Sequence, residues 1–107
     1  MWKENLERFD KIVAMRPELT RLGKTMPYTS ANGHMFSLLN KAGELGFRLS
    51  KEEGEKFMEV YQTTRFKSHG AFMRGYVLIP ESMFDDLELV ASYLNKAHRY
   101  VLTLEPK

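Results

Sequence analysis

The spacing of hydrophobic residues changes along this 107-residue chain from a helical period to a strand period and back. In the first segment, apolar residues recur every three or four positions, which predicts an amphipathic helix that ends near Met15, before Pro17. The same spacing returns in the last segment and predicts a closing helix that Pro106 ends. The apolar positions are Trp2, Leu6, Phe9 and Val13 at the start, and Val90, Leu94, Ala97, Val101 and Leu104 at the end.

Between these helices, short apolar runs indicate strands. Residues 45–49 alternate strictly between apolar and other side chains, as in a half-buried strand, and 35–39 form a second apolar run. The dipeptide Asn32-Gly33 favours a type I′ turn, in which both residues have positive φ. We therefore expect a hairpin that pairs 35–39 with a strand over 20–29. Together with 45–49, these segments predict a three-stranded antiparallel meander.

The second half of the chain contains another helix and two more strands. Ser50 and Glu53 have the spacing of a capping box, in which each side chain satisfies a backbone N–H of the other residue, and they predict a helix that starts after Ser50. Residues 63–67 and 72–79 are rich in β-formers and predict a hairpin with a loop at 68–71. Asp85-Asp86 then supplies the cap of the last helix.

The predicted order is helix, three strands, helix, two strands, helix. We see no internal repeat and no linker, so residues 1–107 are expected to form a single domain. The absence of cysteine excludes disulfides, cysteine-based metal sites and thiol nucleophiles. No apolar run approaches the length of a membrane span, about 18 residues, and the acidic N-terminal segment does not resemble a signal peptide. We therefore expect a cytoplasmic protein with no membrane partner.

The net charge of +2 hides an uneven distribution. Segments 19–43 and 60–80 each contain three basic residues and no acid, while the segments predicted as helices are neutral or acidic. This distribution favours two interpretations: a surface that attracts nucleic-acid phosphates, or basic residues that merely protect sheet edges. The candidate nucleic-acid-binding residues are Arg21, Lys24, Arg65, Lys67 and Arg74.

Catalytic and metal-binding patterns are absent from the sequence. The three histidines lack the spacing of metal ligands, and no serine lies in a nucleophile motif. We therefore expect no enzyme activity, no metal and no cofactor. An alternative is an enzyme or small-molecule binder built around His69, Arg74 and Tyr76. An exposed edge strand also favours self-association.

Several short motifs follow one another along the chain: Lys24-Thr25-Met26, Asn32-Gly33-His34-Met35-Phe36, Gly46-Phe47-Arg48-Leu49-Ser50, Met73-Arg74-Gly75-Tyr76-Val77, Ile79-Pro80-Glu81, Asp86 and Tyr100-Val101-Leu102-Thr103-Leu104. Taken in this order, they resemble the N-terminal domain of the TfoX/Sxy competence regulators. The resemblance implies a bacterial cytoplasmic protein with a two-layer α+β fold that contains one antiparallel five-stranded sheet. It also implies a regulatory interaction domain that acts through protein contacts in transcriptional regulation, with nucleic-acid binding as the alternative. Where the family has Phe-Gly-Gly, this chain has Pro27-Tyr28-Thr29.

Overall fold

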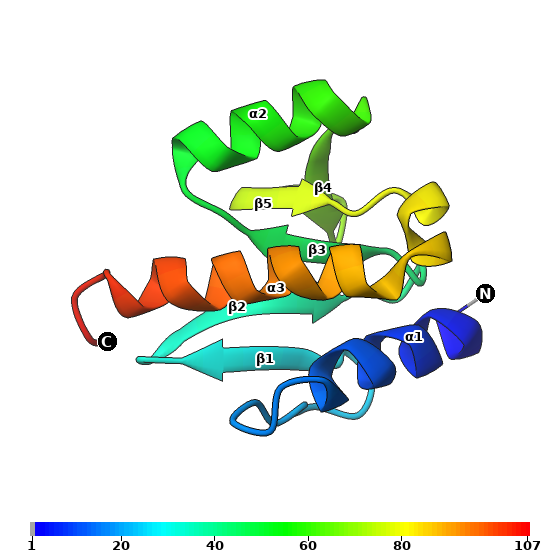
Figure 1. Cartoon of the computed structure of the whole chain (residues 1–107), viewed down its shortest axis with the longest axis horizontal. Helices are drawn as coiled ribbons and strands as arrows, with labels where there is room; N and C mark the ends of the chain where they lie inside the picture. The colour runs from blue at the N-terminus through cyan, green and yellow to red at the C-terminus, as the bar shows by residue number, and fades with distance from the viewer. Residues whose placement is uncertain (1) are drawn as a thin grey trace.

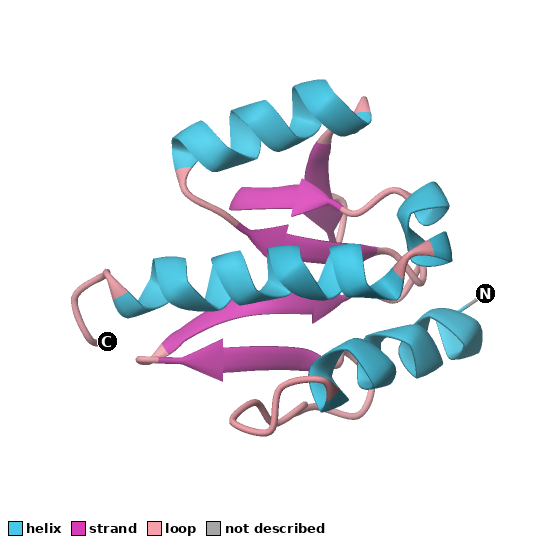
Figure 2. Ribbon diagram, in the orientation of Figure 1, coloured by secondary structure: helices cyan, strands magenta, loops and turns pink. Residues whose placement is uncertain are grey.

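A computed structural model describes residues 2–107 as one antiparallel sheet covered on one face by helices (Figure 1). The predicted order of helices and strands is confirmed, with a short 3-10 helix added before the last α-helix (Figure 2). The elements are α1 (Trp2–Ala14), β1 (Tyr28–Ala31), β2 (His34–Leu39), β3 (Leu45–Arg48), α2 (Lys51–Tyr61), β4 (Arg65–Ser68), β5 (Ala71–Leu78), η1 (Glu81–Asp85) and α3 (Leu87–Leu102).

The five strands lie in the order β1-β2-β3-β5-β4, and every neighbouring pair is antiparallel. Helix α3 crosses the middle of one face of the sheet (Figure 1). Helix α1 lies on one side of α3, near β1, and helix α2 lies on its other side, near β5. This is the predicted α+β architecture. In the part of the chain that the structure describes, no helix is both long and apolar enough to cross a membrane.

The main hydrophobic core lies between the helices and this face of the sheet. Its largest members, from α1, β2, β3 and α2, are the almost fully buried side chains Phe9, Phe36, Phe47 and Phe57. The predicted stripe of α3 faces the same core, and its member Leu94 has no exposed surface. Burial of such a side chain contributes about 1.5–3 kcal/mol, so this core is the main source of stability.

The opposite face of the sheet carries a second, smaller cluster that contains Leu38, Phe66 and Tyr76. Phe66 is fully buried although it belongs to the edge strand β4. Its ring lies against Gly46 of β3, and the Asn40 side-chain amide donates a hydrogen bond of 2.8 Å to the Lys67 carbonyl. Because β5 separates β3 from β4 in the sheet, these contacts require the β4–β5 hairpin to curl over this face.

The local signals in the sequence determine most of the turns and caps. Asn32 and Gly33 have φ of 58° and 79°, as the type I′ turn requires. Asp86 accepts a hydrogen bond from the Leu89 N–H and caps α3. Ser50 caps α2 by accepting from the Glu53 N–H, while the Glu53 carboxylate pairs with Lys96 of α3 instead of reaching back to Ser50.

The prediction of a strand over 20–29 was wrong for most of its length. The strand begins at Tyr28, and the preceding residues form an irregular loop in which Leu22 alone pairs with Tyr28. Two residues explain the difference: Pro27 has no N–H to donate to a neighbouring strand, and Gly23 has a φ of +79° that an extended strand excludes. The second hairpin also turns more tightly than predicted, at His69 and Gly70.

Candidate functional site

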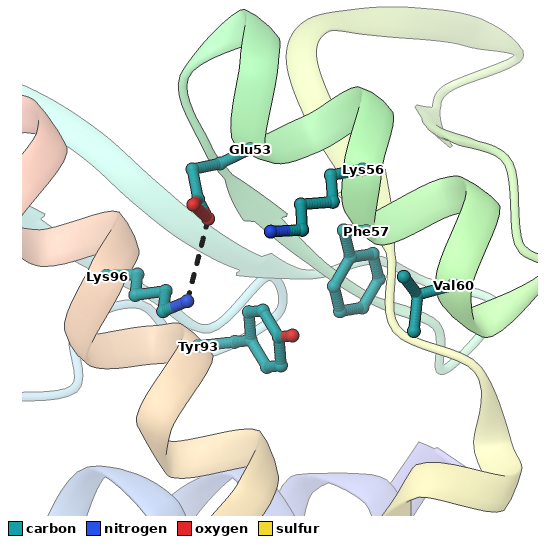
Figure 3. Close-up of a pocket in the computed structure, with 6 residues that line it drawn as sticks. All are labelled: Glu53, Lys56, Phe57, Val60, Tyr93 and Lys96. Carbon is teal, nitrogen blue, oxygen red and sulfur yellow. Dashed lines mark ion pairs between the residues drawn. The ribbon is translucent and has the colours of Figure 1, made fainter.

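Two hollows adjoin α2, and the smaller one lies between α2 and α3 (Figure 3). Its volume is about 100 Å³, and the rings of Phe57 and Tyr93 meet at its base with centroids 4.8 Å apart. Glu53 and Lys96 pair across it at 3.5 Å, and Lys56 and Val60 also line it. This hollow is too small for most organic ligands, whose pockets run to about 300–1,000 Å³.

The larger hollow is a groove of about 500 Å³ between the start of α2, the middle of β5 and the end of α3. Its volume lies within the range of ligand pockets. The side chains that line it include four cations and a single carboxylate, together with two tyrosines. These residues are Arg48, Lys51, Arg65 and Arg74, then Glu55, then Tyr76 and Tyr100.

An irregularity in β5 brings Arg74 to this groove. The pairing of β4 with β5 passes from Arg65–Val77 directly to Lys67–Phe72, so residues 73–76 of β5 stand opposite Phe66 alone. Within this bulge Gly75 has a φ of +82°. A bulge of this kind re-aims the side chains beside it, and here it places Arg74 among the groove residues.

Arg48 lines the groove next to the bulge. A Cβ atom at Gly75 would lie 3.6 Å from Cγ of Arg48, so the Arg48 side chain passes close to the Gly75 backbone. Its guanidinium carbon lies 5.8 Å from the centroid of the Tyr100 ring, at the edge of a cation–π contact. Tyr100 thereby ties the end of α3 to the end of β3.

The positive charges of the groove have no ion-pair partners in residues 2–107. The ion pairs described in that range involve other residues, as in Arg8–Glu81 and Arg21–Asp10, and none includes Arg48, Lys51, Arg65 or Arg74. Like charges gathered around one hollow repel one another, and an anion in the groove relieves that repulsion. The helix dipole of α2, whose first turn forms one wall, adds to the positive potential.

The structure divides the five predicted nucleic-acid-binding residues. Arg65 and Arg74 line the groove, and Lys67 lies next to it on β4, with Nζ 4.7 Å from the centroid of the Phe72 ring. Arg21 and Lys24 lie in the loop before β1, at the other edge of the sheet. Arg21 forms an ion pair of 2.8 Å with Asp10, so its charge is already compensated.

The three residues of the predicted small-molecule site are not brought together. Arg74 and Tyr76 both line the groove, whereas His69 lies exposed in the β4–β5 turn and is not among the residues that line it. Burial raises the pKa of the Tyr76 phenol well above its ordinary value, and its hydroxyl donates a hydrogen bond of 2.8 Å to the Met35 carbonyl. Tyr76 is therefore a neutral, structurally engaged group.

Arg48, Lys51 and Tyr100 line the groove but were not among the predicted binding residues. Arg48 and Lys51 lie within residues 44–59, where five acidic residues outnumber three basic ones, so the net charge of that segment did not indicate a basic surface. One signal was present: Arg48 follows Phe47 in a strictly alternating strand, which places it on the face away from the main core. Nothing in the sequence indicated that Tyr100 would lie beside Arg48.

Among residues 2–107, no three histidine, aspartate or glutamate side chains are placed so that they could hold a metal ion. The groove itself offers cationic donors and one carboxylate, a set that suits an anion and not a cation.

No family model matches the sequence, and no curated protein matches it either. The resemblance to the TfoX/Sxy regulators stays a prediction drawn from the motifs alone.

Proposed function

We propose that this protein is a regulatory domain without enzyme activity that binds nucleic acid through the basic groove. The observation that carries this proposal is the convergence of Arg48, Lys51, Arg65 and Arg74 around a groove of about 500 Å³, without ion-pair partners in residues 2–107. The proposal agrees with the TfoX-like motifs, which imply a role in transcriptional regulation in the bacterial cytoplasm.

The chemistry of the groove supports binding more than catalysis. Arginine and lysine recognise phosphate oxygens by charge-assisted hydrogen bonds, and neither can act as a general base while it is fully protonated. Tyr76, whose pKa burial raises and which lines the groove, is engaged in the fold through its hydrogen bond to the Met35 carbonyl. Arg48, Lys51, Arg65 and Arg74 thus provide affinity for a polyanion, and Glu55 is the single carboxylate beside these four cations.

The test is to titrate a fluorescently labelled oligothymidylate of about 15 nucleotides with the protein at salt concentrations from about 50 to 200 mM. Binding to phosphates releases counterions, so the affinity should fall linearly on a log–log plot against salt. The substitution Arg74→Gln should weaken binding and lower the slope by about 0.7. Lys24→Gln is the matched control, because it removes the same charge from an exposed position outside the groove.

A flat salt dependence, or no binding at about 50 mM salt, would rule out the proposed function. Equal effects of the Arg74 and Lys24 substitutions would place the binding surface elsewhere. Both variants lose one positive charge, so a change in net charge alone would weaken the binding of both equally.

A second candidate is a domain that acts through protein contacts, including self-association. The observation in its favour is Val60 of α2, an apolar side chain that is 61% exposed beside the small hollow of Figure 3. Light scattering should then give a mass above that of one chain, and Val60→Ser should return the mass to the monomer. A monomeric mass for the unaltered protein would exclude self-association through this surface.

A further inference from the structure

Phe72 is an exposed aromatic residue that contacts Arg65, one of the residues that line the groove. It lies on β5 next to the His69–Gly70 turn, and 48% of its surface is exposed. A single exposed apolar side chain is common on protein surfaces, so exposure alone does not mark a site. What distinguishes Phe72 is the pair of cations that contact its ring.

Two cations from β4 contact the Phe72 ring. The guanidinium carbon of Arg65 lies 3.9 Å from the ring centroid, which is a close stacking distance, and Nζ of Lys67 lies 4.7 Å from it. Arg65 also lines the groove. The ring and the groove are therefore joined through one side chain and form a continuous surface.

The hairpin that carries Phe72 is held in place by tertiary contacts. Phe66 is fully buried against Gly46, and the Asn40 side chain donates its hydrogen bond to the Lys67 carbonyl. These contacts fix β4 at Phe66, which lies between Arg65 and Lys67, and at the backbone of Lys67 itself. A ring presented by such a fixed strand loses little conformational entropy when a flat ligand stacks on it.

The combination of charge and aromatic surface selects among ligands. An apolar protein surface would leave the cations of the groove and of β4 uncompensated, at a cost in desolvation. A duplex offers phosphates but keeps the faces of its bases stacked inside. A single strand offers both, since its phosphates match the cations and its unstacked bases can lie on an aromatic ring or a guanidinium plane.

We propose that the Arg65–Phe72 pair is a base-stacking site, and that the groove and this pair together bind single-stranded nucleic acid in preference to duplex. The inference rests on the proposed function, because the groove must first hold the phosphates. Phosphates lie along Arg48, Lys51 and Arg74, and one base stacks against Phe72 and Arg65.

The experiment compares three labelled probes of equal length: an oligothymidylate, an abasic strand with the same phosphates, and a duplex. The oligothymidylate should bind about tenfold more tightly than the abasic strand, which is the effect expected from one stacked base. Phe72→Leu keeps an apolar side chain but removes the ring, so it should lower oligothymidylate affinity about tenfold and leave abasic affinity unchanged. Arg74→Gln should weaken both.

The outcomes separate this inference from the function on which it rests. If Phe72→Leu has no effect while Arg74→Gln weakens all three probes, the stacking site is overturned and the groove function stands. Duplex binding as tight as single-strand binding would also overturn it. If no probe binds at about 50 mM salt, the proposed function itself fails. Because the probe comparison uses the unaltered protein, it still tests the stacking site if Phe72→Leu proves unstable. An oligouridylate probe distinguishes binding of RNA from binding of DNA.

Discussion

The ring of Phe66 on β4 lies directly against Gly46 on β3 and leaves no space for a Cβ atom at Gly46. The two residues are 20 positions apart in the sequence, and β5 separates their strands in the sheet. This contact packs Phe66 into the second hydrophobic cluster and holds in place the hairpin that carries Arg65, Lys67 and Phe72. The candidate site therefore depends on a steric requirement at one glycine.

We predict that Gly46→Ala destabilises the protein by about 1–3 kcal/mol, because the added methyl group must displace a fully buried ring. Urea unfolding at constant pH measures the loss. In the double variant with Phe66→Leu, the clash is reduced, so the combined loss should be smaller than the sum of the single losses. Simple additivity would show that the two residues do not share this contact in solution.

We predict the opposite sign for Gly54→Ala in α2. A Cβ atom at Gly54 would lie 3.5 Å from Cγ1 of Val77, an ordinary van der Waals distance, so there is room for it. Alanine is favoured over glycine within a helix by about 0.5–1 kcal/mol. Urea unfolding should show a gain of that size, and a loss would mean that α2 packs more closely on β5.

The sequence was informative wherever a structural signal is local. The Asn32-Gly33 turn, the caps at Ser50 and Asp86 and the apolar stripe of α3 each depend on residues within a few positions of one another, and all were predicted. The loop before β1 was predicted as a strand because its residues resemble those of a strand that could pair with 35–39. The loop forms an isolated bridge between Leu22 and Tyr28 that does not extend into a strand.

The candidate site was only partly predictable, since it is assembled by tertiary contacts. The net charge of a segment sums over side chains that point in different directions. Arg48 and Lys51 were therefore not recognised as part of a basic surface, because acidic residues elsewhere in 44–59 outweigh them in the sum. Arg21 counted toward a basic surface, yet Asp10 of α1 compensates it at 2.8 Å. The curl of the β4–β5 hairpin, which places Phe72 beside Arg65, depends on the Phe66–Gly46 contact and has no local signal.

The C-terminal residues dock on the β1–β2 turn, and this docking gives a third prediction. The Asn32 side-chain amide donates to the carbonyls of Val101 and Leu104 at 3.0 and 2.9 Å, and the Lys107 N–H donates to the Asn32 carbonyl at 3.2 Å. A Cβ atom at Gly33 would lie 2.9 Å from Cβ of Lys107. We therefore expect Gly33→Ala to displace residues 105–107 from the turn.

Gly70→Ala is the matched control for that substitution. Gly70 has a φ of +76°, close to the +79° of Gly33, but a Cβ atom there would meet nothing within 4 Å. Both alanines bear the backbone strain of a left-handed conformation, about 1–2 kcal/mol. Gly33→Ala should lose more stability than Gly70→Ala in urea, and it alone should speed amide exchange at Lys107. Equal losses and unchanged exchange would show that the docked tail contributes nothing.

The last prediction concerns His98 of α3, whose ring stacks on Phe36 with centroids 5.3 Å apart. Burial lowers the pKa of His98 below its ordinary value of 6.5, the charge of Arg16 lowers it further, and Glu18 opposes the shift. The unfolded chain therefore binds a proton at His98 more readily than the folded protein does. Stability should be greatest above about pH 6.5 and should fall as the pH drops through the folded-state pKa.

Urea unfolding at a series of pH values from about 7.5 to about 5 measures this fall, above the range in which most carboxylates titrate. His98→Phe preserves a ring on Phe36 and removes the titration, so its stability should change less over that interval than that of the unaltered protein. Since Arg16 and Glu18 are retained in the variant, the difference between the two curves isolates His98. Parallel curves would mean that the His98 proton is bound equally well in both states, and that burial against Phe36 does not disfavour the imidazolium.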